Sequence, residues 1–389
     1  MIKRFFFSLF ITGLTMGSST SVFAAPHHKH HRHHHGAKAV EEIKLDLTPV
    51  VVQPYVVPVV TNDPARASFL KRMNLENGVE VRSTRWIEPQ DVTTRNLFIL
   101  SVTQSLEGGF DSVNMYDKGV LSWGVMQWTA ATDSLPPTLI YIKRRLMQTG
   151  QARVWNKVFV AQGLDVDRRG LIAYGKPLRT PDDMRLAFRG SVIPGNYDPK
   201  VVKYWATVMV RAGRQPGIQQ FQREYAQRVV DRVLTQPMPG IPYHLPGHSE
   251  ATVEAITGGD PYAQALVFAL WTNNPRHAQE YVGDAARLAR TKSDSDNPAE
   301  WGPGTFREAL LQRCRVSRFG NWRQRAALIE ARAEALRTSV PEALTPYEQH
   351  CQADLSARKM RLVLLASRHK PASVRWAPGN ATREALRKK

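Results

Sequence analysis

Apolar side chains recur with helical spacing over most of the chain beyond residue 62, and this pattern predicts a mainly α-helical fold. Strand-like alternation is confined to a hairpin over 112–128 and a shorter stretch at 171–178. No repeat of fixed period accompanies the pattern. The predicted helices span 64–73, 91–106, 135–147, 152–161, 181–188, 199–211, 217–234, 251–256, 261–270, 277–289, 305–314 and 322–339.

The predicted helix at 91–106 is apolar almost throughout and leads directly into a carboxylate, Glu107. Asp91 is placed to cap its N-terminus, and Gly108 and Gly109 stop it. Burial and the partial negative charge of the helix C-terminus both favour the neutral acid, so we expect the pKa of Glu107 to rise from about 4.3 toward ~6. Such a group can protonate a leaving oxygen, as the general acid at a glycosidic bond does.

The segment after the two glycines is predicted to be a β-hairpin that forms one wall of a cleft. Its strands cover 112–116 and 120–128, and Asp117-Lys118-Gly119 supplies the turn. Asp111, just before the first strand, is expected to order the loop. Three aromatic residues of the hairpin offer flat apolar faces that could stack on sugar rings: Tyr116, Trp123 and Trp128.

Glu107 followed by Ser122-Trp123-Gly124-Val125-Met126-Gln127 resembles the catalytic signature of the lysozyme-like superfamily. It is most similar to goose-type lysozymes and lytic transglycosylases, in which a helix-ending Glu precedes a β-excursion and an S-x-G-L-M-Q segment. Gly108 departs from the Ser that often follows that Glu, and the hairpin carries an inserted Tyr116-Asp117. The resemblance implies an α+β lysozyme-like helical domain, peptidoglycan as substrate and no cofactor.

The motif assigns further candidate residues, each with an alternative role. Asp117 is either a second catalytic carboxylate or a residue of the hairpin turn. Gln127 either holds the cleft through amide hydrogen bonds or positions an acyl group of the substrate. Ser122 and Gly124 suit a close backbone approach, and Ser122 is also a candidate for substrate binding.

A later segment, Trp271-Thr272-Asn273-Asn274, loosely resembles the Ala-Tyr-Asn-Ala-Gly element that faces the catalytic Glu in lytic transglycosylases. On this basis Trp271 and Asn273 are candidates for the far wall of the cleft. The alternative is that Asn274 caps a helix before Pro275, with Trp271 in the core.

A secretory signal peptide is predicted over 1–24. Lys3 and Arg4 precede an apolar run at 5–14, and small residues follow up to a cleavage site before Ala25. The run is too short for a comfortable membrane span, and no other stretch approaches that length. We therefore expect a periplasmic or secreted protein without a transmembrane segment once the signal is removed.

Residues 25–61 are predicted to be a leader that links the signal to the folded domain. Seven of the twelve histidines lie between 26 and 36. They form either a solvated stretch that gains charge in mild acid or a site that captures zinc, copper or nickel. The metal-capture candidates are His27, His28, His30 and His31. The Val- and Pro-rich stretch at 47–60 is an extended linker or an edge strand.

The catalytic domain is predicted to span 62–355, with a possible lobe boundary at the Pro-rich 237–242. The two cysteines, Cys314 and Cys351, are expected to form a disulfide in an oxidising compartment, and two buried free thiols are the alternative. No CxxC spacing surrounds either cysteine, which argues against a zinc site.

The chain is strongly basic, with a formal net charge of +19, and its tail at 356–389 holds ten Lys or Arg against one acidic residue, Glu384. Partners should therefore be anionic, and an exported chain meets cell-wall polymers and acidic lipids first; a merely solvated tail is the alternative. No nucleic-acid-binding signature is present, so specific nucleic-acid binding is not expected. Nucleophile-elbow, P-loop, H-E-x-x-H and dinucleotide motifs are also lacking.

These features favour a secreted glycosidase that cleaves peptidoglycan with Glu107 as general acid. A second carboxylate would give retention at ~5 to 5.5 Å or inversion at ~6.5 to 9.5 Å. Without one, the resemblance implies attack by the muramic 6-hydroxyl and a 1,6-anhydro product. The alternatives are a non-catalytic wall-binding protein of this fold, a chitin or chitosan hydrolase, and a secreted toxin or effector.

Overall fold

The computed structural model describes residues 46, 48–55, 76–132, 134–238, 251–302, 304–317 and 320–339. The chain separates into two units, Met1–Glu42 and Ile43–Lys389, and every described residue belongs to the second. The predicted signal peptide, histidine tract, helix at 64–73 and basic tail all lie outside the described residues.

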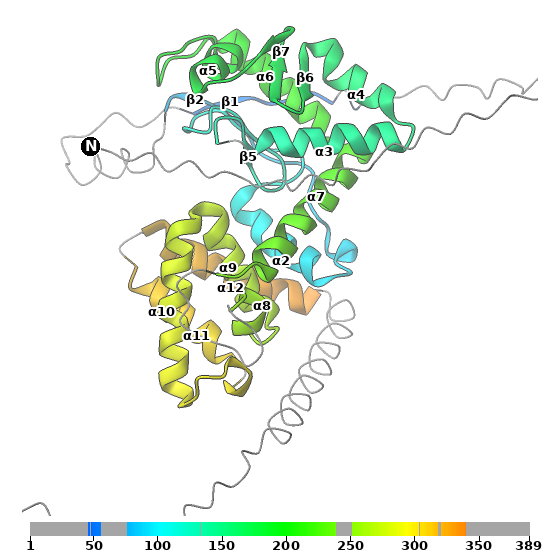
Figure 1. Cartoon of the computed structure of the whole chain (residues 1–389). Coiled ribbons are helices and arrows are strands. Elements are labelled where there is room, and N and C mark those ends of the chain that lie inside the picture. Colours follow the sequence, from blue (N-terminus) through cyan, green and yellow to red (C-terminus); the bar gives the residue numbers. More distant parts are fainter. Residues whose placement is uncertain are drawn as a thin grey trace, which may run out of the picture. The chain divides into compact units, whose positions relative to one another are not determined.

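The described part of the chain is mainly helical with two small antiparallel sheets, which confirms the prediction from apolar periodicity (Figure 1). Three short 3₁₀ turns, η1 (Pro89–Asp91), η2 (Val160–Gln162) and η3 (Pro298–Glu300), join longer elements. The α-helices are α2 (Arg95–Glu107), α3 (Leu135–Gln148), α4 (Ala152–Val158), α5 (Pro181–Arg189), α6 (Pro199–Gly213), α7 (Pro216–Thr235), α8 (Val253–Ile256), α9 (Pro261–Asn273), α10 (Pro275–Ser293), α11 (Thr305–Arg315) and α12 (Gly320–Ser339).

The larger sheet has five antiparallel strands in sequence order. They are β1 (Gln53–Tyr55), β2 (Gly78–Val81), β3 (Val113–Asn114), β4 (Ser122–Trp123) and β5 (Trp128–Thr129). Pairing of Val113 with Trp123 confirms the predicted hairpin, and β1 confirms an edge strand in the Val- and Pro-rich stretch.

The strand-like stretch at 171–178 forms two short strands of the smaller sheet, and a third strand lies beside them. Its strands are β6 (Leu164–Asp167), β7 (Gly170–Ala173) and β8 (Lys176–Pro177), each antiparallel to its neighbour. The turn between β7 and β8 contains Tyr174, which has a left-handed φ of 49°, followed by Gly175 at 76°. These two positive φ values reverse the chain within the stretch.

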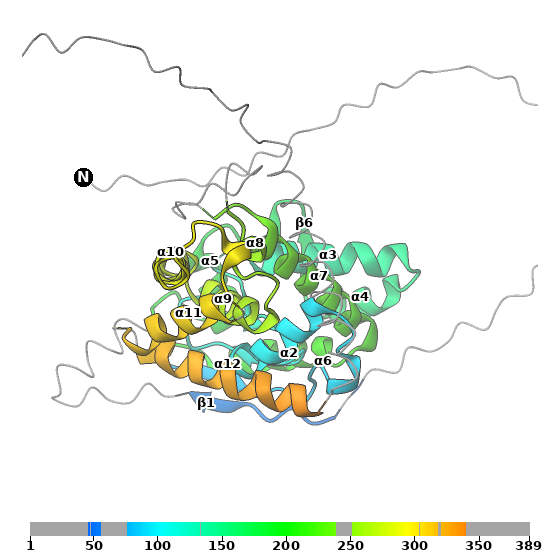
Figure 2. The ribbon, with the colours of Figure 1, turned by 90° about the horizontal axis from the view of Figure 1, so that it is seen from below.

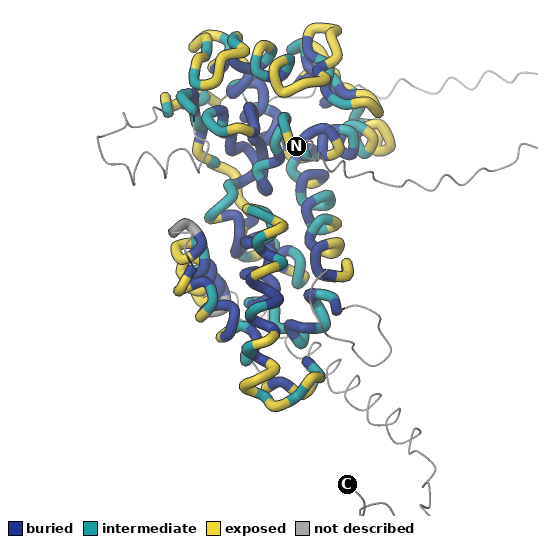
Figure 3. Tube along the Cα trace, turned by 60° about the vertical axis from the view of Figure 1, so that its left-hand side comes forward, coloured by how far each residue is buried: buried dark blue, intermediate teal, exposed yellow. Residues whose placement is uncertain are grey.

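Helix α2 lies at the centre of the packing, in contact with α7, α9 and α12, and its residues from Leu97 to Gln104 are buried. Figure 3 shows the buried residues, in dark blue, gathered in the interior and exposed residues at the outer turns. Figure 2 shows α12 beside α2. The predicted cap at Asp91 is wrong: Asp91 belongs to the preceding turn η1, and Thr94 accepts the Leu97 N–H at 3.3 Å instead. Pro89 begins that extra turn, which shifts the true start of the helix toward its C-terminus.

Gln104 joins α2 to the segment that enters it. Its amide accepts the Ile87 N–H at 2.8 Å and donates to the Ile87 carbonyl at 2.9 Å, while its side chain is buried. A buried amide that meets both its donor and its acceptor needs adds specificity without an unsatisfied polar atom.

Helices α9 to α12 pack against one another and bring the C-terminal part of the described chain onto α2. Asp260 caps α9 by accepting the N–H groups of Tyr262 and Ala263. Trp322 at the start of α12 packs edge-on against Tyr281 and donates to Asn273 at 2.7 Å. These contacts fix α12 at the C-terminal end of α9.

The cysteine and lobe-boundary predictions fall partly outside the described residues. Cys314 is a free, fully buried thiol in α11, where burial raises its pKa to about 12, and Cys351 is not described. The predicted disulfide is therefore not part of the described structure. At the predicted boundary, Pro237 pairs with Thr252 in an isolated bridge, and 239–250 are not described. Among the helices that the structure describes, none has the length and apolar character needed to cross a membrane.

Candidate active site

The end of α2 is fixed by the glycine that follows Glu107. Gly108 has a φ of 129°, which glycine adopts without strain, and its N–H donates to the Gln104 carbonyl at 2.8 Å. A side chain at Gly108 would lie 2.2 Å from the Ser112 hydroxyl and 3.1 Å from the Gln127 amide nitrogen. The turn needs glycine both for its conformation and for the close approach of the hairpin.

Glu107 is almost buried, as the apolar helix predicts, but its carboxylate is paired. Its side chain is 11% exposed. Arg325 of α12 donates to Oε1 at 2.6 Å, and the Thr272 hydroxyl of α9 lies 3.3 Å from the same oxygen. Neither partner has a signal in the sequence pattern. The guanidinium compensates a charge that burial would otherwise penalise.

Gln127, the last residue of the motif, reaches back to the turn beside Glu107. Its amide nitrogen donates to the Ser112 hydroxyl at 2.6 Å and to the Gly124 carbonyl at 3.1 Å. Its amide oxygen accepts from Asn114 at 2.7 Å. The interpretation in which Gln127 holds the hairpin by amide hydrogen bonds agrees with these contacts, and a role in positioning substrate stays a prediction.

Asp117 organises its own turn. Its Oδ1 accepts the Gly119 N–H at 2.8 Å, and the Ser122 hydroxyl lies 3.3 Å from Oδ2. Burial raises the pKa of Asp117 above its usual value, although the Gly119 N–H and the Arg189 charge oppose the shift. These contacts agree with the turn interpretation. Among the described residues, the polar partners of Asp117 do not include Glu107.

Arg189 of α5 holds the same turn from the other side. Its buried guanidinium donates to the Val120 carbonyl at 3.1 Å and to the Asp117 carbonyl at 2.7 Å, and it forms an ion pair with Glu76. Val120 has a left-handed φ of 68°, which is uncommon for a β-branched residue. The three contacts of one side chain stabilise this strained turn.

Ser122 and Gly124 are structural in this arrangement. Ser122 is buried, so the structure corrects its prediction as a substrate-binding residue. A side chain at Gly124 would lie 2.4 Å from the Gln222 amide oxygen. Gln222 of α7 accepts the Val125 N–H at 3.2 Å and donates to the Phe110 carbonyl at 3.0 Å, so one buried amide joins α7 to both ends of the motif.

The aromatic residues of the hairpin do not form a sugar-stacking wall. Trp123 is fully buried and donates to the Met209 carbonyl at 2.8 Å, and Trp128 is buried as well. Both predictions as stacking residues are wrong, because α6 and α7 cover the hairpin face that carries these rings. Tyr116 is partly buried and stacks on Tyr55 with ring centroids 3.8 Å apart. Burial, with the nearby Glu80 carboxylate, raises the pKa of Tyr116 to about 12.

The predicted far wall lies at the end of α9, which also supplies Thr272. Trp271 is partly buried and stacks on Phe268, and Asn273 is exposed and accepts from the Trp322 indole. Asn274 ends α9 and caps α10 by accepting the His277 N–H at 3.2 Å, as the helix-cap alternative predicted. Thr272 brings this segment to Glu107, so the segment does face the carboxylate.

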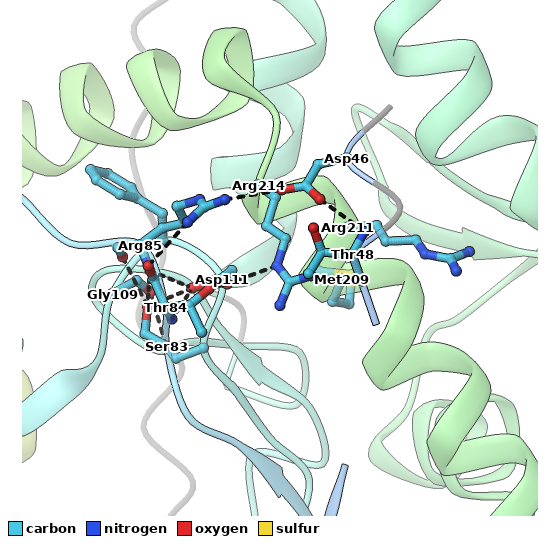
Figure 4. Close-up of polar contacts among 12 residues, drawn as sticks. Asp46, Thr48, Ser83, Thr84, Arg85, Gly109, Asp111, Met209, Arg211 and Arg214 are labelled. Atoms are coloured by element: carbon cyan, nitrogen blue, oxygen red, sulfur yellow. Dashed lines mark hydrogen bonds and ion pairs between the residues drawn. The ribbon is translucent and has the colours of Figure 1, made fainter. Parts of the chain in front are cut away.

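Asp111, itself buried, is the centre of a polar network next to the site (Figure 4). Its carboxylate accepts from the Ser83 hydroxyl at 2.5 Å, from the Thr84 N–H and hydroxyl at 2.9 and 2.7 Å, and from the Arg85 N–H at 3.1 Å. Arg214 donates at 3.2 Å to Oδ2 of Asp111, the oxygen that also accepts from the Thr84 hydroxyl. This network orders the loop, as the sequence predicted, but Arg214 had no signal in the pattern.

In the described part of the chain, no group of three or more His, Cys, Asp or Glu side chains is arranged to hold a metal ion. The histidines proposed for metal capture lie outside that part. No protein-family model, curated protein or solved structure matches this chain.

Proposed function

We propose that this protein cleaves the glycan strands of peptidoglycan and that Glu107 donates the proton to the glycosidic oxygen. The observation that supports the proposal is the joining of Glu107 and the Ser122–Gln127 motif at one turn. Gly108 directly follows the carboxylate, and the Gln127 amide lies against it. The sequence resemblance to lysozymes and lytic transglycosylases rests on the same residues.

The ion pair with Arg325 defines what must happen before proton transfer. A guanidinium favours the ionised carboxylate, whereas a general acid must carry a proton. Arg325 therefore has to leave Oε1 of Glu107 before the acid can act. Since Glu107 is only 11% exposed, the same movement would open the carboxyl to a glycan.

The contacts of Glu107 favour a mechanism with one carboxyl group. Among the described residues its polar partners are Thr272 and Arg325, and Asp117 is engaged in its own turn. In the proposed reaction Glu107 gives its proton to the leaving oxygen. As a carboxylate it then takes the proton of the C6 hydroxyl, whose oxygen attacks C1 of the same muramic residue. The product is a 1,6-anhydro end, and no water is consumed.

The test is digestion of purified sacculi by the mature protein, followed by mass spectrometry of the soluble products. We expect wild type to release anhydro-muropeptides and Glu107→Gln to release none. Glu224→Gln is the matched control, because Glu224 also pairs with an arginine, Arg145 at 3.1 Å, and its polar partners among the described residues do not include Glu107. It should keep full activity.

Each other result has a distinct meaning. Products with reducing ends would indicate hydrolysis and would contradict the proposed intramolecular step. If wild type and Glu107→Gln both sediment with sacculi and neither releases product, the protein is a wall-binding protein. If Glu224→Gln loses activity as Glu107→Gln does, the loss reports unfolding rather than catalysis.

A further inference from the structure

A cavity of about 320 Å³ opens along one face of α6. The lining positions on this helix recur every three or four residues, which places their side chains on one helical face. We refer to this feature as the α6 groove. It is lined by Gln162, Lys200, Lys203, Tyr204, Thr207, Val208 and Arg211.

The α6 groove carries three positive charges that the described protein does not neutralise. Lys200, Lys203 and Arg211 form no ion pair with any described carboxylate, and no acidic side chain lines the groove. Elsewhere in the chain arginines pair closely, as Arg214 does with Asp111 at 3.2 Å. Figure 4 shows the Arg211 side chain pointing away from that network.

Arg211 also has an unmet hydrogen-bonding requirement. Its Nε is buried and has no hydrogen-bond partner within the described residues. A buried donor is normally satisfied, because an unpaired one costs free energy. An anionic ligand in the groove could supply the missing acceptor.

Tyr204 gives the α6 groove flat apolar surface next to these charges, and Tyr174 extends that surface beyond the groove. Tyr204 is 37% exposed, and its hydroxyl donates to the Gln162 carbonyl at 2.8 Å, which fixes the ring. Tyr174, 63% exposed, lies in contact with Tyr204 at the turn of the smaller sheet. Both rings also pack on Trp205 beneath them. The pair is therefore a rigid platform rather than two loose side chains.

We propose that the α6 groove binds an acidic polysaccharide, with Lys200, Lys203 and Arg211 contacting its carboxylates and the tyrosine faces contacting its sugar rings. Cations beside exposed aromatic rings match a polymer of pyranoses that each carry an acid group. Single-stranded nucleic acid also combines anionic groups with flat rings, but the sequence has no nucleic-acid-binding signature and is predicted to be exported. The inference is independent of Glu107 and of cleavage.

The test is fluorescence anisotropy of fluorescein-labelled oligogalacturonate titrated with the full chain at low ionic strength. The groove variant is Lys200→Gln/Lys203→Gln/Arg211→Gln. Its matched control, Arg168→Gln/Arg276→Gln/Lys292→Gln, removes the same charge from exposed positions outside the groove and away from the turn that carries Tyr174. We expect the groove variant to bind at least about tenfold more weakly, equivalent to about 1.4 kcal/mol, and the control to change by less than about threefold.

Further variants separate recognition from general charge attraction. Tyr204→Ala leaves the charge unchanged and should weaken binding by about threefold or more, as loss of a stacking surface does. Glu107→Gln should bind as wild type does, because the groove does not include it. Thermal unfolding of each variant verifies that it is folded.

Two results would overturn the proposal. Equal weakening in the groove and control variants would mean that only net charge attracts the polymer. Tighter binding of a single-stranded oligothymidylate than of the oligogalacturonate, lost in the groove variant, would assign the groove to nucleic acid instead.

Discussion

Replacing Asp111 by alanine should destabilise the protein strongly, because the change leaves a buried guanidinium without its anion. The Arg214 side chain is 5% exposed, and its remaining hydrogen bond goes to the Thr48 carbonyl at 2.9 Å. A carbonyl accepts the hydrogen bond but does not neutralise the charge. The variant therefore keeps a charge in a place from which water is excluded.

The expected loss of unfolding free energy depends on which partners of Asp111 can form hydrogen bonds with water once the carboxylate is removed. Thr84 and Arg85 are exposed and Ser83 is partly exposed, so each of their donors should contribute only about 0.5–1.5 kcal/mol. Removal of one partner of a buried ion pair typically costs about 3–5 kcal/mol, so Arg214 dominates the total. Asp111→Asn keeps one acceptor oxygen for the loop, but its NH₂ group would face the Arg214 donor, so we expect that variant to lose most of the same stability, about 3 kcal/mol.

The assay is urea-induced unfolding followed by tryptophan fluorescence, with the change in free energy taken at constant m-value. Asp182→Ala is the control, since its carboxylate is 70% exposed and its pair with Arg185 should contribute at most about 0.5–1 kcal/mol. Adding Arg214→Met to Asp111→Ala should recover part of the loss, because no unpaired guanidinium then remains. A loss below about 1 kcal/mol in Asp111→Ala, or no recovery in the double variant, would refute this reasoning.

Three further predictions concern the site. Burial raises the pKa of Asp117, so the folded protein binds that proton more tightly than the unfolded chain, and the contribution of Asp117 to stability falls as the pH rises above about 3.8. Asp117→Asn should remove this loss in urea titrations between pH 3 and 7 and should retain sacculus cleavage; cleavage as low as in Glu107→Gln would return Asp117 to a catalytic role. Arg325→Gln should raise the rate at which a sacculus suspension clears, because the guanidinium no longer has to leave Oε1 of Glu107, and an unchanged rate would contradict the proposed displacement. Gly108→Ala should cost about 1–3 kcal/mol in backbone strain, because a φ of 129° with a ψ of 172° is a conformation that essentially only glycine adopts, plus the cost of its clash; Gly150→Ala, with a left-handed φ of 74° and open space around it, should cost less. Equal losses in the two glycine variants, measured by urea unfolding, would refute the close approach of the hairpin.

The positions of the helices and of the central hairpin could be predicted because they depend on local periodicity and on turn residues. The helix at 199–211 is found as Pro199–Gly213, and the hairpin pairs through Val113 and Trp123. The predicted cap was wrong because two residues that favour helix caps, Asp91 and Thr94, lie close together. Pro89 begins a separate 3₁₀ turn that includes Asp91, so Thr94 is left to cap the helix.

Long-range partners could not be predicted from one sequence. Arg325 lies 218 residues after Glu107, and the chain holds 53 lysines and arginines that could equally have supplied the cation. The prediction that the Trp123 ring is open to stack on a sugar was wrong for a related reason. Alternation along a short strand assigns a ring to one face of the sheet, but only the packing of α6 decides whether that face meets solvent.

The distant origin of the partners of Glu107 also bears on how the protein matures. Thr272 and Arg325 follow it by 165 and 218 residues, so the carboxylate gains its partners only after α9 and α12 have been synthesised and docked. Contacts of such separation form late, because the intervening chain must first be brought together. A chain that emerges N-terminus first, from a ribosome or through a translocation pore, therefore carries Glu107 unpaired until its last described helix arrives.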